Sequence, residues 1–271
     1  MIKIENVEIA GWEPAIRGMR NPKNSWEKSD TLYIPQNYCD NEEDYELSEV
    51  CGGYAPVVKE NDFDLMSRLS AGGPVHAKYR RMIAVYADIT APLYWWKEFD
   101  TYKVGTVSNS CSTMHKIADK EFTMEDFSCE HLLDVTTSTD SVKAVSVRLY
   151  NEAVYLNGIY RTSRGVFLNI LQCLNHFRML YLETKDKKYW WQMIQLLPSS
   201  YNQRRTEMLN YEVLANIYKW RKNHKLDEWC VHDVPKEHEF RNRDFASGKW
   251  GFCDWIESLP YSELITGKEN D

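Results

Sequence analysis

Arginines in the last third of the chain could bind an anionic, planar ligand. The segment 197–224 reads LPSSYNQRRTEMLNYEVLANIYKWRKNH and carries Arg204, Arg205 and Arg221. A guanidinium presents its donors as a rigid fork, which matches a phosphate or the carbonyl–imide edge of a base. The alternative is that Arg204 and Arg221 are solvated or pair with nearby acids such as Glu207. The sequence leaves both interpretations open, although a solvated role suits Arg221 less because it falls within an apolar pattern.

Two groups of cysteine and histidine residues offer other chemistry. Cys111 lies four residues before His115 in a polar stretch and could form a thiol–imidazole nucleophile, but no third partner is visible. The second group, Cys230 with His232 and His238, has a spacing that fits no standard zinc site. We therefore predict loop residues and no metal site there, and a metal-dependent enzyme is the weaker alternative.

Apolar periodicity predicts the helices that hold the arginines. In one helix the apolar residues recur at three-to-four spacing, as Phe167, Ile170, Leu171, Leu174, Phe177 and Tyr181. After the break at 198–200, a second helix is predicted from about Gln203 to Lys222. One of its faces holds Asn210, Leu214, Ile217 and Arg221. This assignment places Arg204 and Arg221 on the same helix.

The remaining segments supply a sheet and a polar loop. The alternation over 1–11 and the β-forming run 81–89 predict two strands, the second of them central. Ala91-Pro92 leads into a short aromatic helix at 93–99, and a loop rich in Gly, Ser, Thr and Asn follows at 102–115. The segment 21–64 is polar and loop-rich. We predict an α+β fold, with long helices packed on a mixed β-sheet, in a single domain of residues 1–271.

Composition excludes several classes of protein. Of the 271 residues 43% are hydrophobic and 13% aromatic, which is enough for a core and unlike a disordered chain. A formal net charge of −7 without a basic tail argues against nucleic acid as a partner. No apolar run approaches the ~20 residues that cross a bilayer, and the N-terminus lacks the layout of a signal peptide. Seven scattered cysteines without a C-x-x-C pair fit reduced thiols, so we expect a soluble, cytoplasmic protein without a membrane partner.

The spacing within 197–221 resembles that of the flavin-dependent thymidylate synthases. In that family a Leu-Pro pair, an Arg, two Asn and a second Arg open the nucleotide site. Here the same spacing holds Leu197-Pro198, Arg204, Asn210, Asn216 and Arg221. His224 follows one residue earlier than the family's His. The resemblance implies that both arginines contact the substrate nucleotide, that Arg221 is catalytic and polarises the pyrimidine, and that the asparagines and the histidine line the flavin.

A second part of the resemblance departs further from the family. The family signature R-H-R-x-x-S-x-N-E-x-S-x-R follows a strand, an Ala-Pro pair and a short aromatic helix, and the same order occurs here. Anchored at Ala91-Pro92, the R-H-R triplet falls on 101–103 and the final Arg on Thr113, so only Lys103 keeps a positive charge in the triplet. The chain therefore resembles a divergent member, in which neighbouring residues must supply the missing donors if an anionic cofactor binds.

The resemblance implies two sets of site residues. The substrate is expected to contact Arg204, Arg221, Glu98, Cys111 and Ser112. The cofactor is expected to contact His76, Tyr102, Lys103, Thr106, Asn109, Asn210, Asn216 and His224. Ser108 belongs to the same polar loop.

The implied activity is the methylation of a uracil nucleotide, dUMP to dTMP, or a closely related nucleotide modification. The implied cofactor is FAD, with NADPH and methylenetetrahydrofolate as co-substrates, and the implied assembly is a homotetramer. Because the charged triplet is not retained, a second hypothesis stays open: a non-catalytic nucleotide-binding or interaction protein that keeps the fold and has lost flavin chemistry.

Overall fold

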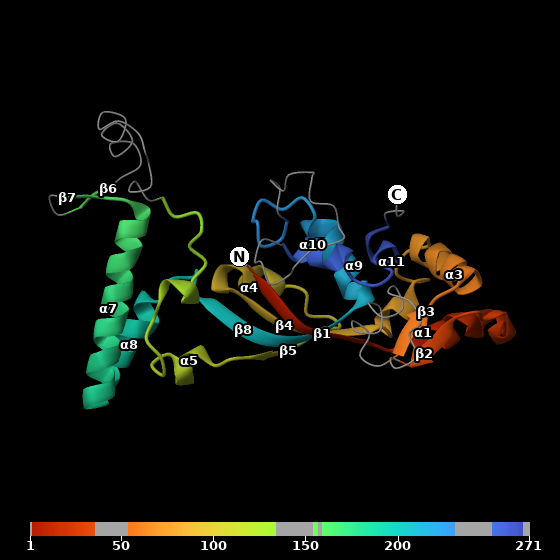
Figure 1. Ribbon diagram of the computed structural model, residues 1–271, viewed down its shortest axis with the longest axis horizontal. Coiled ribbons are helices and arrows are strands. Elements are labelled where there is room, and N and C mark those ends of the chain that lie inside the picture. Colours follow the sequence, from red (N-terminus) through yellow and green to blue (C-terminus); the bar gives the residue numbers. More distant parts are fainter. Residues whose placement is uncertain (1, 36–53, 134–153, 157–158, 231–250, 268–271) are drawn as a thin grey trace. The chain divides into compact units, whose positions relative to one another are not determined.

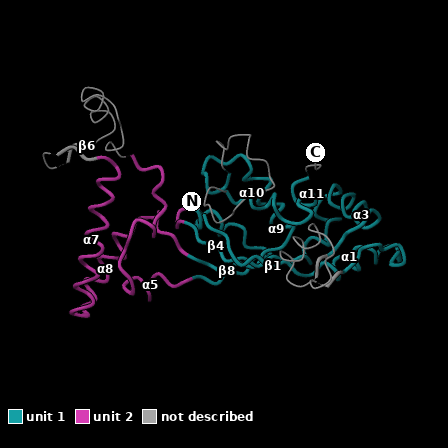
Figure 2. The backbone as a smooth tube through the Cα atoms, viewed as in Figure 1, with its two compact units in different colours: residues 1–91, 95–110, 204–271 teal, residues 92–94, 111–203 magenta. Residues whose placement is uncertain are grey.

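The computed structural model describes residues 2–35, 54–133, 154–156, 159–230 and 251–267 (Figure 1). The chain divides into two compact units, shown in teal and magenta in Figure 2. Unit 1 comprises residues 1–91, 95–110 and 204–271, and unit 2 comprises residues 92–94 and 111–203. In the described ranges no helix is long and apolar enough to cross a membrane. The single domain expected from the sequence stays a prediction.

A four-stranded sheet has the order β1-β4-β8-β5. Its strands are β1 (Lys3–Ala10), β4 (Ala84–Pro92), β8 (Asn202–Asn210) and β5 (Val107–Ser110). β1 pairs antiparallel with β4, with Ile4 opposite Ile89, and β5 pairs antiparallel with β8. Along β4, side chains at alternate positions from Val85 to Ala91 are buried, as expected when one face of a strand packs on a core. The predicted strands at 1–11 and 81–89 are confirmed, the second as an inner strand.

The predicted helix over 203–222 is wrong in its first part, because residues 202–210 form strand β8. Burial in this segment alternates, with Glu207 and Leu209 buried and Met208 between them only half-buried. That period of two fits a strand and leaves no helical stripe. Helix α9 (Tyr211–Arg221) begins only after Asn210, whose side chain caps it by accepting from the Val213 backbone N–H at 3.0 Å. Arg204 and Arg221 therefore lie on different elements.

The short aromatic helix is confirmed as α4 (Leu93–Phe99). Trp95 and Phe99 of α4 pack with Trp229 and with Phe252 of α10 (Phe252–Glu257), at ring-centroid distances of 4.7–5.8 Å. The polar stretch that follows α4 is not a continuous loop. Residues 107–110 form the edge strand β5, and Thr113–Lys116 form the short helix α5, which the Ser112 side chain caps.

Unit 2 is built around two helices, α7 (Ser163–Thr184) and α8 (Lys187–Leu196), which contact each other. Phe167 and Leu174 of α7 and Met193 of α8 are buried in one core cluster. The amphipathic helix predicted over 167–181 is thus confirmed. The unit also holds the short helix η5 (Met124–Asp126) and the paired strands β6 (Val154–Leu156) and β7 (Ile159–Arg161).

The segment 21–64, predicted to be loop-rich, contains several short elements where it is described. They are η1 (Asn21–Lys23), η2 (Trp26–Lys28), the antiparallel strands β2 (Leu32–Pro35) and β3 (Tyr54–Val57), and the start of α3 (Glu60–Ala71). Residues 36–53 lie outside the described ranges. Unit 1 is completed by α1 (Trp12–Arg20), η4 (Lys78–Arg81) and α11 (Glu263–Thr266).

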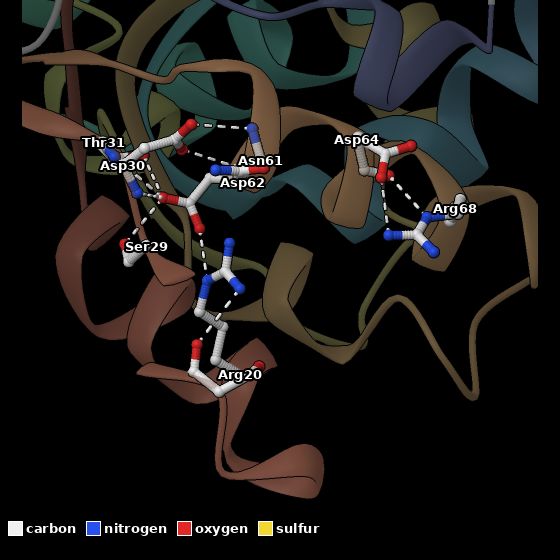
Figure 3. A network of polar contacts seen from close by, with 9 residues as sticks. Arg20, Ser29, Asp30, Thr31, Asn61, Asp62, Asp64 and Arg68 are labelled. Atoms are coloured by element: carbon white, nitrogen blue, oxygen red, sulfur yellow. Dashed lines mark hydrogen bonds and ion pairs between the residues drawn. The ribbon is translucent and has the colours of Figure 1, made fainter. Parts of the chain in front are cut away.

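A buried carboxylate ties this segment to α1 and α3 (Figure 3). Asp62 is fully buried, and its Oδ1 accepts from Arg20 Nε at 2.7 Å. Its Oδ2 accepts from the Ser29 hydroxyl at 2.7 Å and from both the backbone N–H and the hydroxyl of Thr31. Burial alone would raise the pKa of Asp62, but the hydrogen bonds from Ser29, Thr31 and Arg20 bring that pKa below its ordinary value.

A second buried carboxyl group lies in the sheet. Glu207 of β8 is fully buried; Ser108 donates to its Oε1, and its Oε2 has no partner in the part of the chain that the structure describes. Burial raises the pKa of Glu207 to about 7, against the smaller lowering effect of the Ser108 hydrogen bond.

The substitution Asp62→Asn should destabilise the protein by about 3 kcal/mol, because it leaves Arg20 buried without its counter-charge. Urea denaturation at neutral pH measures the effect. The matched control is Asp64→Asn in the exposed Asp64–Arg68 pair of the same helix, for which we expect less than about 1 kcal/mol (Figure 3). Equal effects of the two substitutions would refute the structural role of Asp62.

The free energy of unfolding should fall as the pH rises from about 5 to 7. With a pKa of about 7 in the folded protein against an ordinary 4.5, Glu207 binds more protons in the folded than in the unfolded state within that window. Glu207→Gln should remove this fall in the free energy of unfolding, which amounts to at most about 3 kcal/mol over the window. Glu183→Gln, at an exposed position, should leave the fall unchanged. Urea titrations at several pH values give the slope, and an unchanged slope in Glu207→Gln would contradict the assignment.

Candidate functional site

Arg221, at the end of α9, is held between a carboxylate and aromatic rings. Its Nη1 donates to Glu98 Oε2 at 2.7 Å and its Nε donates to the Tyr102 hydroxyl at 2.9 Å. The guanidinium carbon lies 4.9 Å from the ring centroid of Trp229 and 5.6 Å from that of Tyr102, within cation–π range. The Nη2 group makes no hydrogen bond to any described residue, and it is not fully buried. One edge of the guanidinium is therefore open to a ligand.

One oxygen of Glu98 accepts two hydrogen bonds and also faces the ring of His224. Besides Arg221, its Oε2 accepts from Trp229 Nε1 at 3.1 Å and lies 3.4 Å from His224 Nε2. His224 Nδ1 accepts from the Leu226 backbone N–H at 3.2 Å, so the ring proton belongs on Nε2, facing Glu98. We call Glu98, Tyr102, Arg221, His224 and Trp229 the Arg221 cluster.

The Arg221 cluster gathers four of the residues expected from the sequence and adds one. Glu98 comes from α4, Tyr102 from the turn after it, and Arg221 and His224 from the end of α9 and beyond. Trp229 was missed, since a Trp outside any periodic pattern gives no sequence signal. The requirement that a buried indole N–H finds an acceptor explains its place beside Glu98.

Arg204 is not part of the Arg221 cluster. Its Nη2 donates to Asp88 Oδ2 at 2.7 Å, and Asp88 also accepts from Thr206 and Asn6. These hydrogen bonds, the one from Thr206 first, lower the pKa of Asp88 to about 2. Arg204 and Arg221 thus have separate carboxylate partners, and no described residue hydrogen-bonds to both guanidinium groups. The substrate-binding role of Arg204 stays a prediction.

Arg205, not Arg204, lies on the α4 side of β8. It pairs with Asp100 at 2.7 Å, and its guanidinium carbon lies 4.1 Å from the Trp96 ring centroid. Neighbouring residues of a strand point to opposite faces, which separates the two arginines.

A cavity of about 1460 Å³ opens on the side of α9 that faces away from the Arg221 cluster, and we call it the α9 cavity. Residues of α3, η4, α9, α11 and the turn at 104–105 line it. Asn210 and Asn216, both expected to contact the cofactor, are among them. From α9 and the residue after it, the lining takes 212, 213, 215, 216, 218, 219 and 222, a broad face whose middle lies opposite to Arg221. At Gly105, with φ of 82°, a Cβ would lie 2.7 Å from Asn210 Nδ2, so the close approach of the turn to α9 requires glycine.

The other expected cofactor residues do not line the α9 cavity. His76 is exposed in the turn after α3, Lys103 is exposed, and Asn109 is exposed on β5. The hydroxyl of Thr106 donates to the Tyr102 carbonyl, which fixes the turn beneath the Arg221 cluster. Their roles stay predictions.

Two expected substrate residues belong to unit 2. Cys111 is exposed, and its carbonyl accepts from Gln203 Nε2 at 2.9 Å. Ser112 caps α5 by accepting from the His115 backbone N–H at 3.2 Å. Within the described residues no hydrogen bond joins the side chains of Cys111 and His115.

The cysteine–histidine group near the C-terminus is described only in part. Cys230 is buried and its Sγ donates to the Arg221 carbonyl at 3.3 Å, while His232 and His238 lie outside the described residues. Among the side chains that the structure describes, no group of His, Cys, Asp and Glu could hold a metal ion.

Comparison with solved structures identifies the fold. Thymidylate synthase X from Helicobacter pylori, solved with FAD and dUMP, matches over 98% of this chain and 97% of its own, with a TM-score of 0.50 and 12% identity. A UMP/dUMP methylase, PolB from Streptomyces cacaoi, bound with 5-Br UMP, matches over 80% of this chain and 76% of its own, with a TM-score of 0.44 and 10% identity. No protein-family model matches the sequence, and no curated protein does. At this identity the likeness establishes the fold alone: the predicted α+β class is confirmed, and the chain has a fold like that of thymidylate synthase X.

Proposed function

We propose that the chain binds a uracil nucleotide at the Arg221 cluster and methylates its base in a flavin-dependent reaction. The observation that carries the proposal is the Arg221–Glu98 pair, in which a guanidinium whose Nη2 has no hydrogen-bond partner among the described residues lies beside a carboxylate. Glu98 Oε1 makes no hydrogen bond to a described residue, and it is not fully buried. A donor beside an acceptor complements the adjacent carbonyl and N–H groups of the uracil imide edge.

The aromatic residues of the cluster suit a flat ring. Tyr102 and Trp229 flank the guanidinium, and both offer apolar faces next to a charged group. The fold comparison supports this ligand class, because thymidylate synthase X from Helicobacter pylori, whose fold the chain shares, was solved with dUMP.

In the proposed reaction Arg221 holds a ring carbonyl and stabilises the negative charge that develops there when the base carbon is attacked. Glu98 and Tyr102 fix the guanidinium before the ligand arrives, so little reorganisation is needed during the reaction. The His224 ring keeps Glu98 oriented through its Nε2. Each of these roles requires only residues of unit 1.

The α9 cavity suits a flavin dinucleotide. Its volume exceeds the roughly 300–1,000 Å³ of most small-molecule sites. Asn210 and Asn216 supply amide groups, and Val104, Val213 and Ile265 supply apolar surface. With its adenine and phosphate part bound there, FAD would supply the redox chemistry of one-carbon transfer by extending its flavin ring out of the cavity to the base held by Arg221, because reacting groups must lie within about 3.5 Å of each other. NADPH and methylenetetrahydrofolate are the proposed co-substrates, and a homotetramer is the proposed assembly.

The alternative is a non-catalytic nucleotide-binding protein. The segment 101–103 favours it, because only Lys103 keeps a positive charge where the resemblance expects the R-H-R triplet, and Tyr102 there accepts a hydrogen bond from Arg221.

The substitution Arg221→Lys should weaken dUMP binding by about 10- to 100-fold, because a lysine cannot keep both the Glu98 contact and a forked contact with the base. Isothermal titration calorimetry measures the affinity, and circular dichroism checks that the variant folds. Arg17→Lys, at an exposed pair on α1, is the control and should bind like the wild type. Equal affinities in all three proteins would remove Arg221 from the site.

The purified chain should take up FAD, with visible flavin absorbance that is released on denaturation. Formation of dTMP should stop when dUMP, methylenetetrahydrofolate or NADPH is left out. A colourless protein that takes up no FAD yet binds dUMP would contradict the enzyme and support the non-catalytic alternative.

A further inference from the structure

The α9 cavity concentrates positive charge in an acidic protein. Its lining includes the five cations Arg68, Arg80, Arg81, Lys219 and Lys222, against the two carboxylates Glu212 and Glu263. The whole chain carries a formal net charge of −7, so this excess is local. A concave surface lined by one sign of charge raises the local concentration of ligands of the opposite sign.

Two of these cations are already satisfied. Arg80 pairs with Glu212 at 2.8 Å and donates to the Leu264 carbonyl at 2.9 Å, so it joins η4, α9 and α11. Arg68 pairs with Asp64 at 2.6 Å on its own helix (Figure 3). Both are structural contacts that need no ligand.

The other three cations have no carboxylate partner among the residues that the structure describes. Lys219 Nζ lies 5.3 Å from the Trp220 ring centroid, and Lys222 Nζ lies 5.7 Å from that of Tyr218. Within the described ranges, the Arg81 side chain donates to the Pro74 carbonyl alone, at 3.3 Å. Lys219 and Lys222 are exposed and lie one helical turn apart, so their like charges repel, and an anion bound between them would relieve that repulsion. An uncompensated group of this kind on a cavity wall favours an anionic ligand.

We propose that Lys219, Lys222 and Arg81 bind the phosphate groups of a phosphoanhydride ligand in the α9 cavity. The apolar lining at Val104, Val213 and Ile265 accommodates the planar part of such a ligand. That the ligand is FAD rests on the proposed function, whereas the anion site rests on the cavity and its charges. The resemblance expects the positive charge of an R-H-R triplet at 101–103. Only Lys103 is charged there, and it does not line the cavity, so Lys219, Lys222 and Arg81 would supply the positive charge instead.

The test measures the binding of inorganic pyrophosphate and of FAD to the full chain by calorimetry at low ionic strength. The double variant Lys219→Ala/Lys222→Ala should bind each ligand at least about tenfold more weakly than the wild type. Lys23→Ala/Lys28→Ala removes two exposed charges outside the cavity and is the matched control, expected to lose less than about twofold. Lys219→Arg/Lys222→Arg keeps the charge and should retain binding.

The outcomes separate this inference from the proposed function. In one outcome the wild type binds pyrophosphate but takes up no FAD, and the double variant loses pyrophosphate binding. This result supports the anion site and overturns the flavin assignment. FAD binding equal in the wild type and the double variant overturns the anion site and leaves the flavin assignment standing. If the wild type binds neither ligand, the anion site is refuted, while dUMP binding through Arg221 is decided by its own titration.

Discussion

The Glu98 carboxylate is the contact around which the candidate site is organised. It joins α4, the end of α9 and the segment 224–229 by accepting from Arg221 and Trp229 and by facing His224. A guanidinium that is mostly removed from water needs a counter-charge, and the aromatic faces of Tyr102 and Trp229 add to the stabilisation. Without Glu98, only the Tyr102 hydrogen bond and the two ring contacts would orient the guanidinium of Arg221.

Helix α9 connects two chemically different surfaces. Its 214/217/221 side is buried apart from the guanidinium of Arg221, and its 212/216/219 side lines the α9 cavity. The Asn210 cap fixes where the helix starts, and thereby which residues face each side. In the proposed function, a nucleotide base and a second, anionic ligand use opposite faces of one short helix.

Local patterns in the sequence predicted part of this arrangement. Strand β4, helix α4 and helix α7 follow from β-forming composition, a proline at a helix start and apolar periodicity. The helix predicted over 203–210 was wrong because that stretch is polar and has little periodicity of its own; its place between β4 and β5 determines its conformation. The spacing from Asn210 to Arg221 correctly indicated a helix that ends in a functional arginine candidate.

Long-range contacts could not be predicted in the same way. Arg221 and Glu98 are 123 positions apart, and neither Trp229 nor the cavity residues Lys219 and Lys222 belong to a recognisable motif. The resemblance placed Arg204 beside Arg221, yet period-two geometry turns Arg204 toward Asp88 on the other face of the sheet. Charge pairing in three dimensions, rather than spacing along the chain, sets which arginine is available to a ligand.

The central claim is that the Arg221–Glu98 pair recognises the edge of a uracil base. A crystal structure of the protein grown with dUMP tests it most directly. The account predicts the pyrimidine edge on Arg221 Nη2 and Glu98 Oε1, next to the rings of Tyr102 and Trp229. A nucleotide bound elsewhere, with the Arg221 cluster unchanged and its open edge facing solvent, would contradict it.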